Sequence, residues 1–173
     1  MVGSVPPVLA VGLTGIIASG KEEVASFFVT AGFELFSLSD RVREEATRQG
    51  FQPPSRTDLQ RIGNELRRRA GPGVLAYRTL QKIEAAGMRA AVIDGFRNPH
   101  EVTYFQQRSQ FYLVAVDAPS EVRFERLLQR QRPGDPRTLE EFSKWMLEIV
   151  ACGEPEEGQQ VGACLQLAQF TIQ

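Results

Sequence analysis

The residues best suited to chemistry form one short run near the start of the chain. Residues 12–21 read Gly-Leu-Thr-Gly-Ile-Ile-Ala-Ser-Gly-Lys, and the last seven have the G-x-x-x-x-G-K spacing of a phosphate-binding loop, or P-loop. In such a loop successive backbone N–H groups point inward, and the following helix N-terminus adds partial positive charge. Lys21 would reach the β- and γ-phosphates of a nucleotide. We therefore expect phosphate to be bound by the whole loop: Gly15, Ile16, Ile17, Ala18, Ser19, Gly20 and Lys21.

The position after Lys21 departs from this motif. A P-loop has Ser or Thr there to hold Mg²⁺, whereas this chain has Glu22, followed by Glu23. A carboxylate can coordinate Mg²⁺, which prefers oxygen ligands, but it also places a like charge beside the phosphate oxygens. The helix dipole also favours acidic residues in the first turn of a helix, and this effect alone could explain why Glu22 and Glu23 stand there. Glu22 is therefore a candidate Mg²⁺ ligand whose charge also opposes nucleotide binding.

Strand and helix patterns alternate along the chain and must position this loop. The apolar runs predict strands at residues 8–11, 33–36, 89–93, 111–116 and 170–172. Helical patterns cover residues 21–31, 39–48, 58–69, 74–86, 99–108, 119–129 and 139–149, with capping boxes expected at 57–60 and 138–141. Near-continuous apolar strands are typical of a parallel sheet covered on both faces. The sequence thus predicts a three-layer α/β domain with right-handed crossovers.

The length favours one domain over residues 1–173, because a second complete domain would be cramped. Two stretches depart from the regular alternation. Residues 37–86 hold three helical patterns without a clear strand, which predicts a helical region beside the sheet. Residues 129–138 form a short arginine-rich connection broken by Pro and Gly, which is the candidate lid.

Composition narrows the possible partners and the location. The formal net charge is −1, so nothing draws the chain generally toward nucleic acid or an anionic membrane. No apolar segment is long enough to span a bilayer, and no charged region precedes an apolar stretch at the N-terminus, so a cytoplasmic location is expected. The single histidine, His100, argues against a zinc site. Cys152 and Cys164 form no Cys-x-x-Cys pair and are expected to be buried thiols rather than a disulfide.

Several segments resemble P-loop kinases of the nucleoside monophosphate kinase and dephospho-CoA kinase-like group. Residues 12–21 resemble the P-loop of dephospho-CoA kinases, and Val-Ile-Asp-Gly-Phe at 92–96 resembles the strand-end Asp-Gly-Phe of adenylate-type kinases. Residues 94–102 are similar to the D-x-I-R-N-P-x-E-V run of one kinase-like subgroup, and the similarity extends through residues 37–43, 62–67 and 116–119. The resemblance implies a five-stranded parallel core with the P-loop strand central, a helical substrate-binding region at 37–86 and a small lid at 129–138.

The resemblance also implies roles for particular side chains. Asp94 ends an apolar strand, where a carboxylate can hold Mg²⁺ directly or through water; the alternative is an Asp that starts a turn or caps the next helix. Arg97 could clamp a substrate phosphate, although a loop arginine can also be a surface charge. Asp40 and Arg43 share one helical face near the expected substrate, and a solvated ion pair explains them equally well.

Four arginines fall where the lid is expected: Arg126, Arg130, Arg132 and Arg137. Phosphoryl transfer needs positioning and cancellation of spreading negative charge, which converging arginines supply. Arg126 lies inside the predicted helix, and we expect it to be an ordinary helix-surface residue. The catalytic set is therefore predicted to be Lys21, Asp94, Arg130, Arg132 and Arg137.

Two functions remain open at this point. The first is an ATP- and Mg²⁺-dependent kinase that phosphorylates a small phosphorylated acceptor. The chain lacks the sequence that dephospho-CoA kinases proper carry after the third strand, which favours a nucleoside or deoxynucleoside monophosphate over dephospho-CoA. The second is a nucleotide-binding sensor or regulator that has lost catalysis because Glu22 replaces the P-loop hydroxyl.

Overall fold

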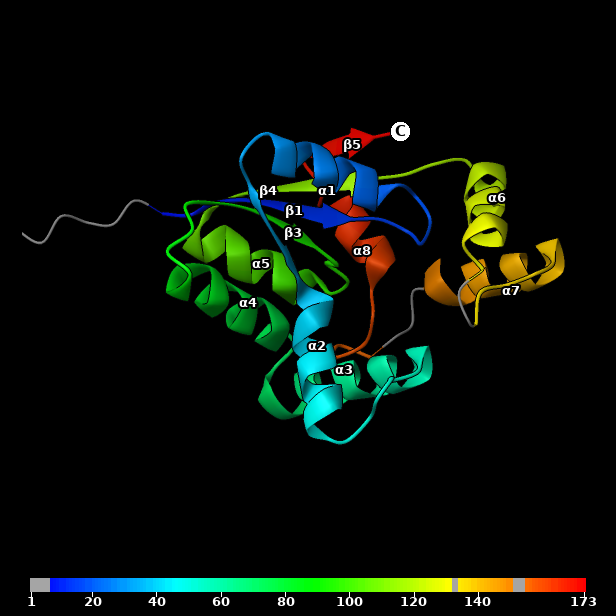
Figure 1. Ribbon diagram of the computed structural model, residues 1–173, viewed down its shortest axis with the longest axis horizontal. Helices are drawn as coiled ribbons and strands as arrows, with labels where there is room; N and C mark the ends of the chain where they lie inside the picture. Colours follow the sequence, from blue (N-terminus) through cyan, green and yellow to red (C-terminus); the bar gives the residue numbers. More distant parts are fainter. Residues whose placement is uncertain (1–6, 132–133, 151–154) are drawn as a thin grey trace, which may run out of the picture.

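A parallel sheet forms the centre of the computed structural model, which describes residues 7–131, 134–150 and 155–173 (Figure 1). Its five strands lie in the order β2-β3-β1-β4-β5, and every neighbouring pair is parallel. Their bounds are β1 Leu9–Thr14, β2 Glu34–Ser37, β3 Ala90–Asp94, β4 Gln110–Val116 and β5 Phe170–Ile172. The predicted α/β class, the parallel sheet and the central position of the P-loop strand are confirmed.

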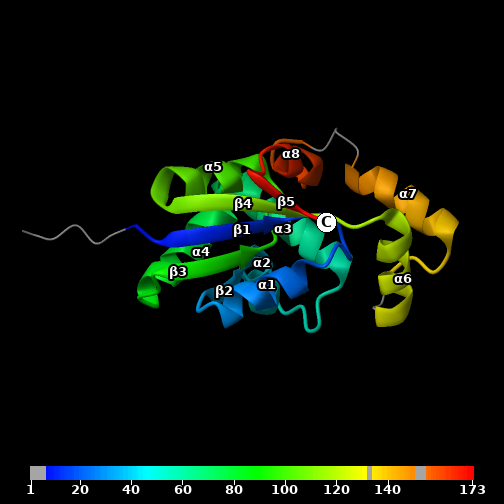
Figure 2. The same cartoon turned by 90° about the horizontal axis from the view of Figure 1, so that it is seen from above.

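Helices cover both faces of this sheet and extend past one of its ends. Their bounds are α1 Lys21–Thr30, α2 Leu38–Arg48, α3 Arg56–Ala70, α4 Val74–Ala85, α5 Pro99–Arg108, α6 Ser120–Arg130, α7 Leu139–Val150 and α8 Val161–Gln166. One core cluster joins α1 to the first face, and a larger one joins the second face to α2, α3, α4, α5 and α8. Figures 1 and 2 show α6 and α7 beyond the carboxyl ends of the strands. The result is the predicted three-layer arrangement with additional helices at the end where the P-loop lies.

The strand order fixes which loops meet at that end. β1 lies between β3 and β4, with Leu13 opposite Asp94 and Thr14 opposite Ala115. The Thr14 hydroxyl donates to the carbonyl oxygen of Phe96 at 3.0 Å, tying the two strand ends together. Because parallel strands end at the same edge of a sheet, the P-loop and the segment after Asp94 emerge side by side.

Most predicted elements agree with the structure to within a few residues, and the differences have local causes. The capping box of α3 is formed by Ser55 and Asp58 rather than by residues 57–60, because Ser55 Oγ accepts from the Asp58 N–H at 3.1 Å while Asp58 accepts from the Ser55 N–H at 3.0 Å. The box at Thr138 and Glu141 is confirmed by N–H bonds of 3.2 and 3.3 Å. The short helix α8 was not expected.

Two expectations from composition can be compared with the described residues. Cys164 is buried with a free thiol, as expected, whereas Cys152 lies outside the described residues. Burial raises the pKa of the Cys164 thiol to about 12, so it stays protonated at neutral pH. Within the described part of the chain, no helix is both long enough and apolar enough to cross a membrane.

Gly12 allows the central strand to pack against aromatic rings. A Cβ atom at Gly12 would lie 2.5 Å from Phe111 Cζ and 2.7 Å from Phe96 Cε2, distances that real contacts do not reach. Phe96 and Phe111 also pack on each other and on Phe105, with ring centroids 5.3 to 5.5 Å apart, so neither ring can move away freely. The strand therefore requires glycine at this position.

We predict that Gly12→Ala lowers the free energy of unfolding by about 1–3 kcal/mol, because the added methyl group overpacks a filled core. Gly63→Ala is the matched control, since its Cβ would meet only Arg67 and Val42 at 3.6 Å inside α3. Alanine favours helix by up to about 1 kcal/mol, so this control should be neutral or stabilising. Urea denaturation of both variants measures the difference, and equal midpoints would contradict the packing argument.

Candidate functional site

The P-loop depends on two glycines at its ends. At Gly15, φ is 153°, and a Cβ there would lie 2.3 Å from the carbonyl oxygen of Val116. Gly20 has a φ of 103° and precedes α1, which begins at Lys21 without a side-chain cap. An uncapped helix start leaves backbone N–H groups for an anion. The loop is thus shaped for close approach of a phosphate to the backbone.

The Lys21 side chain folds back over this loop. Its ammonium group donates to the carbonyl oxygens of Gly15 at 2.8 Å and Ile16 at 3.0 Å, and it lies 3.4 Å from Ser19 Oγ. These neutral acceptors hold the charge near the loop, where anionic phosphate oxygens would bind it more strongly.

Charged side chains surround Lys21. The pKa of Lys21 is lowered from its usual 10.5 to about 8, mainly by burial and in part by the nearby positive charges of Arg97 and Arg130. Asp94 and Glu22 oppose this effect by raising the pKa. The fold therefore brings three separate parts of the chain together: the P-loop end with Lys21 and Glu22, the segment after β3 with Asp94 and Arg97, and Arg130 at the end of α6.

Asp94 has a buried oxygen atom that lacks a partner. It is the last residue of β3, and its Oδ1 makes no hydrogen bond within the described residues. An unpaired buried carboxylate oxygen is costly, and a cation would satisfy it. The described residues hold no group of three or more His, Cys, Asp or Glu side chains that could bind a metal ion on their own. A Mg²⁺ ion at Asp94 would therefore take most of its ligands from phosphate and water.

A cavity of about 670 Å³ opens beside the P-loop. It lies between α2, α3, the segment after β3 and the connection from α6 to α7. Its apolar lining includes Leu38, Val42, Leu59, Leu75, Trp145 and Val161. Its charged lining consists of Arg43, Arg56, Arg67, Arg97, Arg130 and Asp135. Arg43, Arg67 and Arg130 are each paired with a carboxylate, so the positive charge that the cavity offers to an anion is chiefly that of Arg56 and Arg97.

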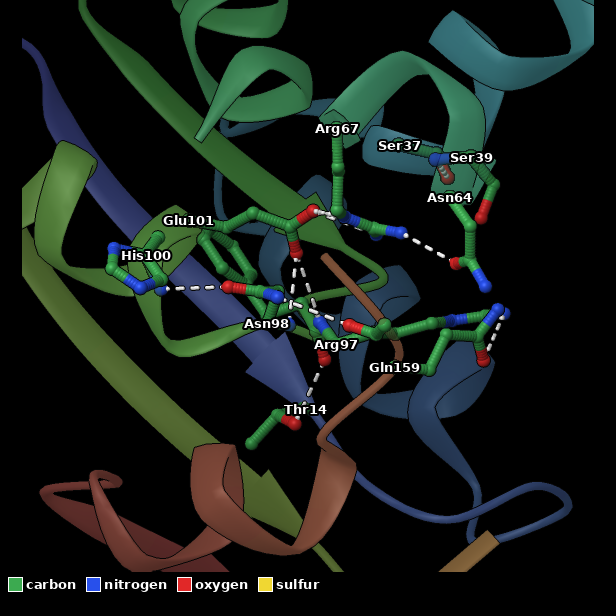
Figure 3. Close-up of polar contacts among 12 residues, drawn as sticks. Thr14, Ser37, Ser39, Asn64, Arg67, Arg97, Asn98, His100, Glu101 and Gln159 are labelled. Atoms are coloured by element: carbon green, nitrogen blue, oxygen red, sulfur yellow. Dashed lines mark hydrogen bonds and ion pairs between the residues drawn. The ribbon is translucent and has the colours of Figure 1, made fainter. Parts of the chain in front are cut away.

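A buried carboxylate organises one wall of this cavity (Figure 3). Glu101 is fully buried, and its Oε1 accepts from Arg67 Nε at 3.0 Å and Nη2 at 2.8 Å. Its Oε2 accepts from the backbone N–H groups of Arg97 and Asn98, both at 3.1 Å. Asn98 Oδ1 in turn caps α5 by accepting from the N–H of His100 at 3.0 Å.

The same network fixes the C-terminal segment that completes the wall. Asn98 Nδ2 donates to the carbonyl oxygen of Gly158 at 3.0 Å, and the Gln160 N–H donates to the Arg97 carbonyl oxygen at 2.6 Å. The guanidinium group of Arg97 donates to Gln159 Oε1 at 3.4 Å, as Figure 3 shows. Arg97 is therefore held at its backbone and at its side chain.

The lid arginines have different surroundings. Arg130 forms two hydrogen bonds to Asp135, at 2.7 and 2.8 Å, and lines the cavity. Arg132 lies outside the described residues. Arg137 is exposed and lines a smaller pocket of about 270 Å³, so the structure does not bring it into the main cavity. Arg126, expected to be an ordinary surface residue, instead donates to the carbonyl oxygen of Ala18 at 3.1 Å and so contacts the P-loop.

The remaining predicted pair lies on α2. Asp40 and Arg43 form an ion pair of 3.0 Å with about half of each side chain exposed. Arg43 lines the cavity, whereas Asp40 does not. The pair is thus the solvated helical interaction considered above, with one member facing the cavity.

Several residues of this site were not found from the sequence. The capping-box spacing of Asn98 and Glu101 was a visible signal, but the partner Arg67 lies 34 residues away from Glu101. Arg56 and Trp145 come from α3 and α7, and the Arg56 guanidinium carbon lies 3.9 Å from the Trp145 ring centroid. Nothing in their spacing indicates that contact.

Comparison with known proteins agrees with this architecture. A family model described as an AAA domain matches residues 11–144, which include the P-loop, Asp94 and the predicted lid. A UPF0200 protein of Hyperthermus butylicus is 38% identical over 164 residues, covering 95% of this chain and 84% of the relative. The chain belongs to the UPF0200 family. Another member, from Pyrococcus horikoshii, is 34% identical over 165 residues, covering 92% of this chain and 84% of that protein.

Solved structures extend the comparison to the fold of this UPF0200 protein. A shikimate kinase from Acinetobacter baumannii matches with a TM-score of 0.57 at 14% identity, covering 96% of this chain and 83% of that chain. A protein from Thermus thermophilus has the same TM-score at 21% identity, covering 95% of this chain and 87% of that chain. These similarities show a P-loop kinase fold.

We predict that Arg67→Ala lowers the free energy of unfolding by about 3–5 kcal/mol, because it leaves the buried Glu101 charge unpaired. Arg68→Ala is the matched control on the next position of α3. Its partner Glu65 is on the surface, and 66% of the Arg68 side chain is exposed, so its loss should cost under about 1 kcal/mol. Chemical denaturation compares the two, and similar losses would contradict a special role for the buried pair.

Proposed function

We propose that this UPF0200 protein transfers the γ-phosphoryl group of ATP to a small phosphorylated acceptor. The acceptor is a nucleoside or deoxynucleoside monophosphate, or dephospho-CoA, and Mg²⁺ is the required ion. One observation carries the proposal: Lys21, Asp94, Arg97 and Arg130 converge where the P-loop meets an arginine-lined cavity. Such an arrangement places a nucleotide phosphate and an anionic acceptor next to each other.

Each of these residues has a physical role in the proposed reaction. The backbone N–H groups of the P-loop hold the β- and γ-phosphates, and Lys21 exchanges its bonds to Gly15 and Ile16 for phosphate oxygens. An acceptor oxygen attacks the γ-phosphorus, the bond to the β–γ bridging oxygen breaks, and ADP leaves. The attacking oxygen belongs to the phosphate of a nucleoside monophosphate or, for dephospho-CoA, to a ribose hydroxyl that gives up its proton. Arg97 and Arg130 offset the negative charge that spreads over the transferred group.

Asp94 is the residue that would hold the metal ion. Its unpaired buried oxygen fits a cation, and Mg²⁺ bound there would neutralise part of the phosphate charge. Glu22 is a second candidate ligand, because its carboxylate already acts electrostatically on Lys21.

The connection between α6 and α7 is proposed to act as the lid. It begins after Arg130 and ends before Leu139, and it carries Asp135 into the cavity wall. Closure over the acceptor would exclude water, which competes with the acceptor for the γ-phosphoryl group. Arg137 and Arg132 belong to this lid, and their contribution to catalysis stays a prediction.

A second function follows from the same P-loop. Glu22 places negative charge beside Lys21, where phosphates would lie, and no hydroxyl replaces it at position 23. A protein that binds nucleotide but transfers phosphate poorly would serve as a sensor or regulator. The kinase is favoured because Asp94 and the cavity arginines have no evident use in a protein that binds only the nucleotide.

A product screen tests the proposed kinase. The protein is incubated with ATP, Mg²⁺ and, in separate reactions, each nucleoside and deoxynucleoside monophosphate and dephospho-CoA, and products are separated by chromatography. We expect ADP and a phosphorylated acceptor in equal amounts, and no transfer by Asp94→Asn. Lys82→Met, on the exposed outer side of α4, is the control that should retain activity. ATP binding without turnover on any acceptor would favour the regulator.

The lowered pKa of Lys21 predicts a pH dependence of ATP affinity. Burial holds this pKa at about 8 in the free protein, so Lys21 loses its charge above that pH. Bound phosphates would restore the charge, and binding therefore takes up a proton. We expect affinity to fall by up to about tenfold per pH unit above pH 8, measured by isothermal titration calorimetry in buffers of different ionisation enthalpy.

Lys21→Arg is the control for this pH effect. Arginine stays charged throughout the range, so the variant should bind with little change between pH 7 and pH 9. Equal affinities of the wild-type protein at these two pH values would contradict the shifted Lys21.

Glu22→Thr tests the cost of the carboxylate in the P-loop. Removing a negative charge beside the phosphates should tighten Mg·ATP binding by about tenfold, the effect of a like charge partly screened by water. Glu23→Thr is the matched control, because it removes the neighbouring carboxylate from the same first turn of α1. Unchanged or weaker binding by Glu22→Thr would show that Glu22 assists the nucleotide, as a metal ligand would.

A further inference from the structure

We propose that Arg56 and Arg97 together form the anion subsite for the acceptor, and that Arg56 rests on Trp145 until an anion takes its place. This inference rests on the proposed function, because it assigns the phosphate of the acceptor to a defined pair of side chains. The ligand class is a phosphate monoester dianion. Anion binding would then release the contact between α3 and α7.

Arg56 is a cation without an acidic partner. It is the first residue of α3, it lines the cavity, and its guanidinium carbon lies 3.9 Å from the centroid of the Trp145 ring. Other cavity arginines are paired: Arg67 with Glu101 and Arg130 with Asp135. Among the described residues, no carboxylate lies within ion-pair distance of Arg56. Its positive charge is therefore available to a ligand.

The charges around Arg56 favour an anion. The pKa of Arg56 is lowered to about 10, mainly by partial burial and in part by the nearby charges of Arg97 and Arg130, while Asp135 raises it. Like charges gathered at one place in a partly buried cavity repel each other. A dianion bound between Arg56 and Arg97 would offset this repulsion, because each guanidinium group would then face a negative charge.

The two arginines differ in how they are held. Arg97 is fixed by Glu101 at its N–H, by Gln160 at its carbonyl oxygen and by Gln159 at its guanidinium group. Within the described residues, the Arg56 guanidinium group forms no ion pair and no side-chain hydrogen bond, and it stacks on the Trp145 ring. A cation–π contact is weaker than a pair of charge-assisted hydrogen bonds to a phosphate. An entering phosphate would therefore meet one fixed arginine and draw the other from the indole.

The position of Arg97 explains why the subsite suits a phosphoryl acceptor. Arg97 lines the same cavity as Arg56, and it is close enough to both Lys21 and Arg56 to affect the pKa of each. A phosphate held by Arg97 and Arg56 would present an oxygen toward the nucleotide bound at Lys21. A neutral acceptor such as a free nucleoside would leave both cations without a partner.

Tryptophan fluorescence can report directly on the contact between Arg56 and Trp145, because Trp145 is the one tryptophan in the sequence. The wild-type protein is titrated with inorganic phosphate, with AMP and with adenosine, and binding is followed by tryptophan emission and by calorimetry. We expect phosphate and AMP to bind with a saturable emission change and adenosine to give none. Absence of phosphate and AMP binding would overturn the subsite.

Variants of Arg56 and Trp145 show whether Arg56 binds phosphate or only holds α3 against α7. Arg56→Ala should weaken phosphate binding at least about tenfold and abolish the emission change, and Arg56→Lys, which keeps charge but not the planar fork, should be intermediate. Arg61→Ala, also on α3 and stacked on Phe51 outside the cavity, should match the wild type. Trp145→Phe should keep phosphate affinity in calorimetry.

The behaviour of Arg56→Ala separates the anion subsite from the kinase reaction. Wild-type phosphate affinity in Arg56→Ala would overturn the subsite and show that Arg56 only joins α3 to α7. If the protein transfers phosphate and Arg56→Ala has an unchanged KM for the acceptor, the kinase stands and the subsite falls. If phosphate binds through Arg56 and no acceptor is phosphorylated, the subsite stands and the kinase falls.

Discussion

The carboxylate of Glu101 connects the parts of the chain on which the candidate site depends. It is fully buried, and it accepts hydrogen bonds from Arg67 of α3 and from the backbone of Arg97 and Asn98 after β3. A buried charge is tolerated only when it is paired and its lone pairs are occupied. Both conditions hold here. The interaction therefore fixes the distance between the helical region and the sheet, and with it the cavity and the direction of Arg97.

Positive charge then accumulates on the cavity side of this network. Arg97 and Arg130 act on Lys21, and Arg97 and Arg130 act again on Arg56. Such a concentration of like charge costs free energy in the empty protein, and anionic ligands recover it. The negative charges of Asp94 and Glu22 act in the opposite direction on Lys21, and Asp135 does so on Arg56. The proposed site thus combines an excess of positive charge with carboxylates that partly offset it.

The sequence predicted those features that depend on neighbouring residues. The apolar strands, the P-loop glycines and the strand-end Asp94 are local patterns, and parallel strand order then brings Lys21 and Asp94 together. Such local patterns could not predict the contacts between helices that lie far apart in the sequence. The Arg56–Trp145 stacking and the bond from Arg126 to Ala18 depend on how α3, α6 and α7 pack, which no periodicity records. At α3, Ser55 and Thr57 are both good caps, and only the fold shows that Ser55 is used.

A crystal structure of the protein with Mg²⁺ and a non-hydrolysable ATP analogue tests the central claim most directly. We expect the β- and γ-phosphates in the loop from Gly15 to Lys21, with Mg²⁺ within reach of Asp94. The Lys21 ammonium group should have moved from the Gly15 and Ile16 carbonyl oxygens to phosphate oxygens. An analogue bound elsewhere, with Lys21 still donating to Gly15, would contradict it.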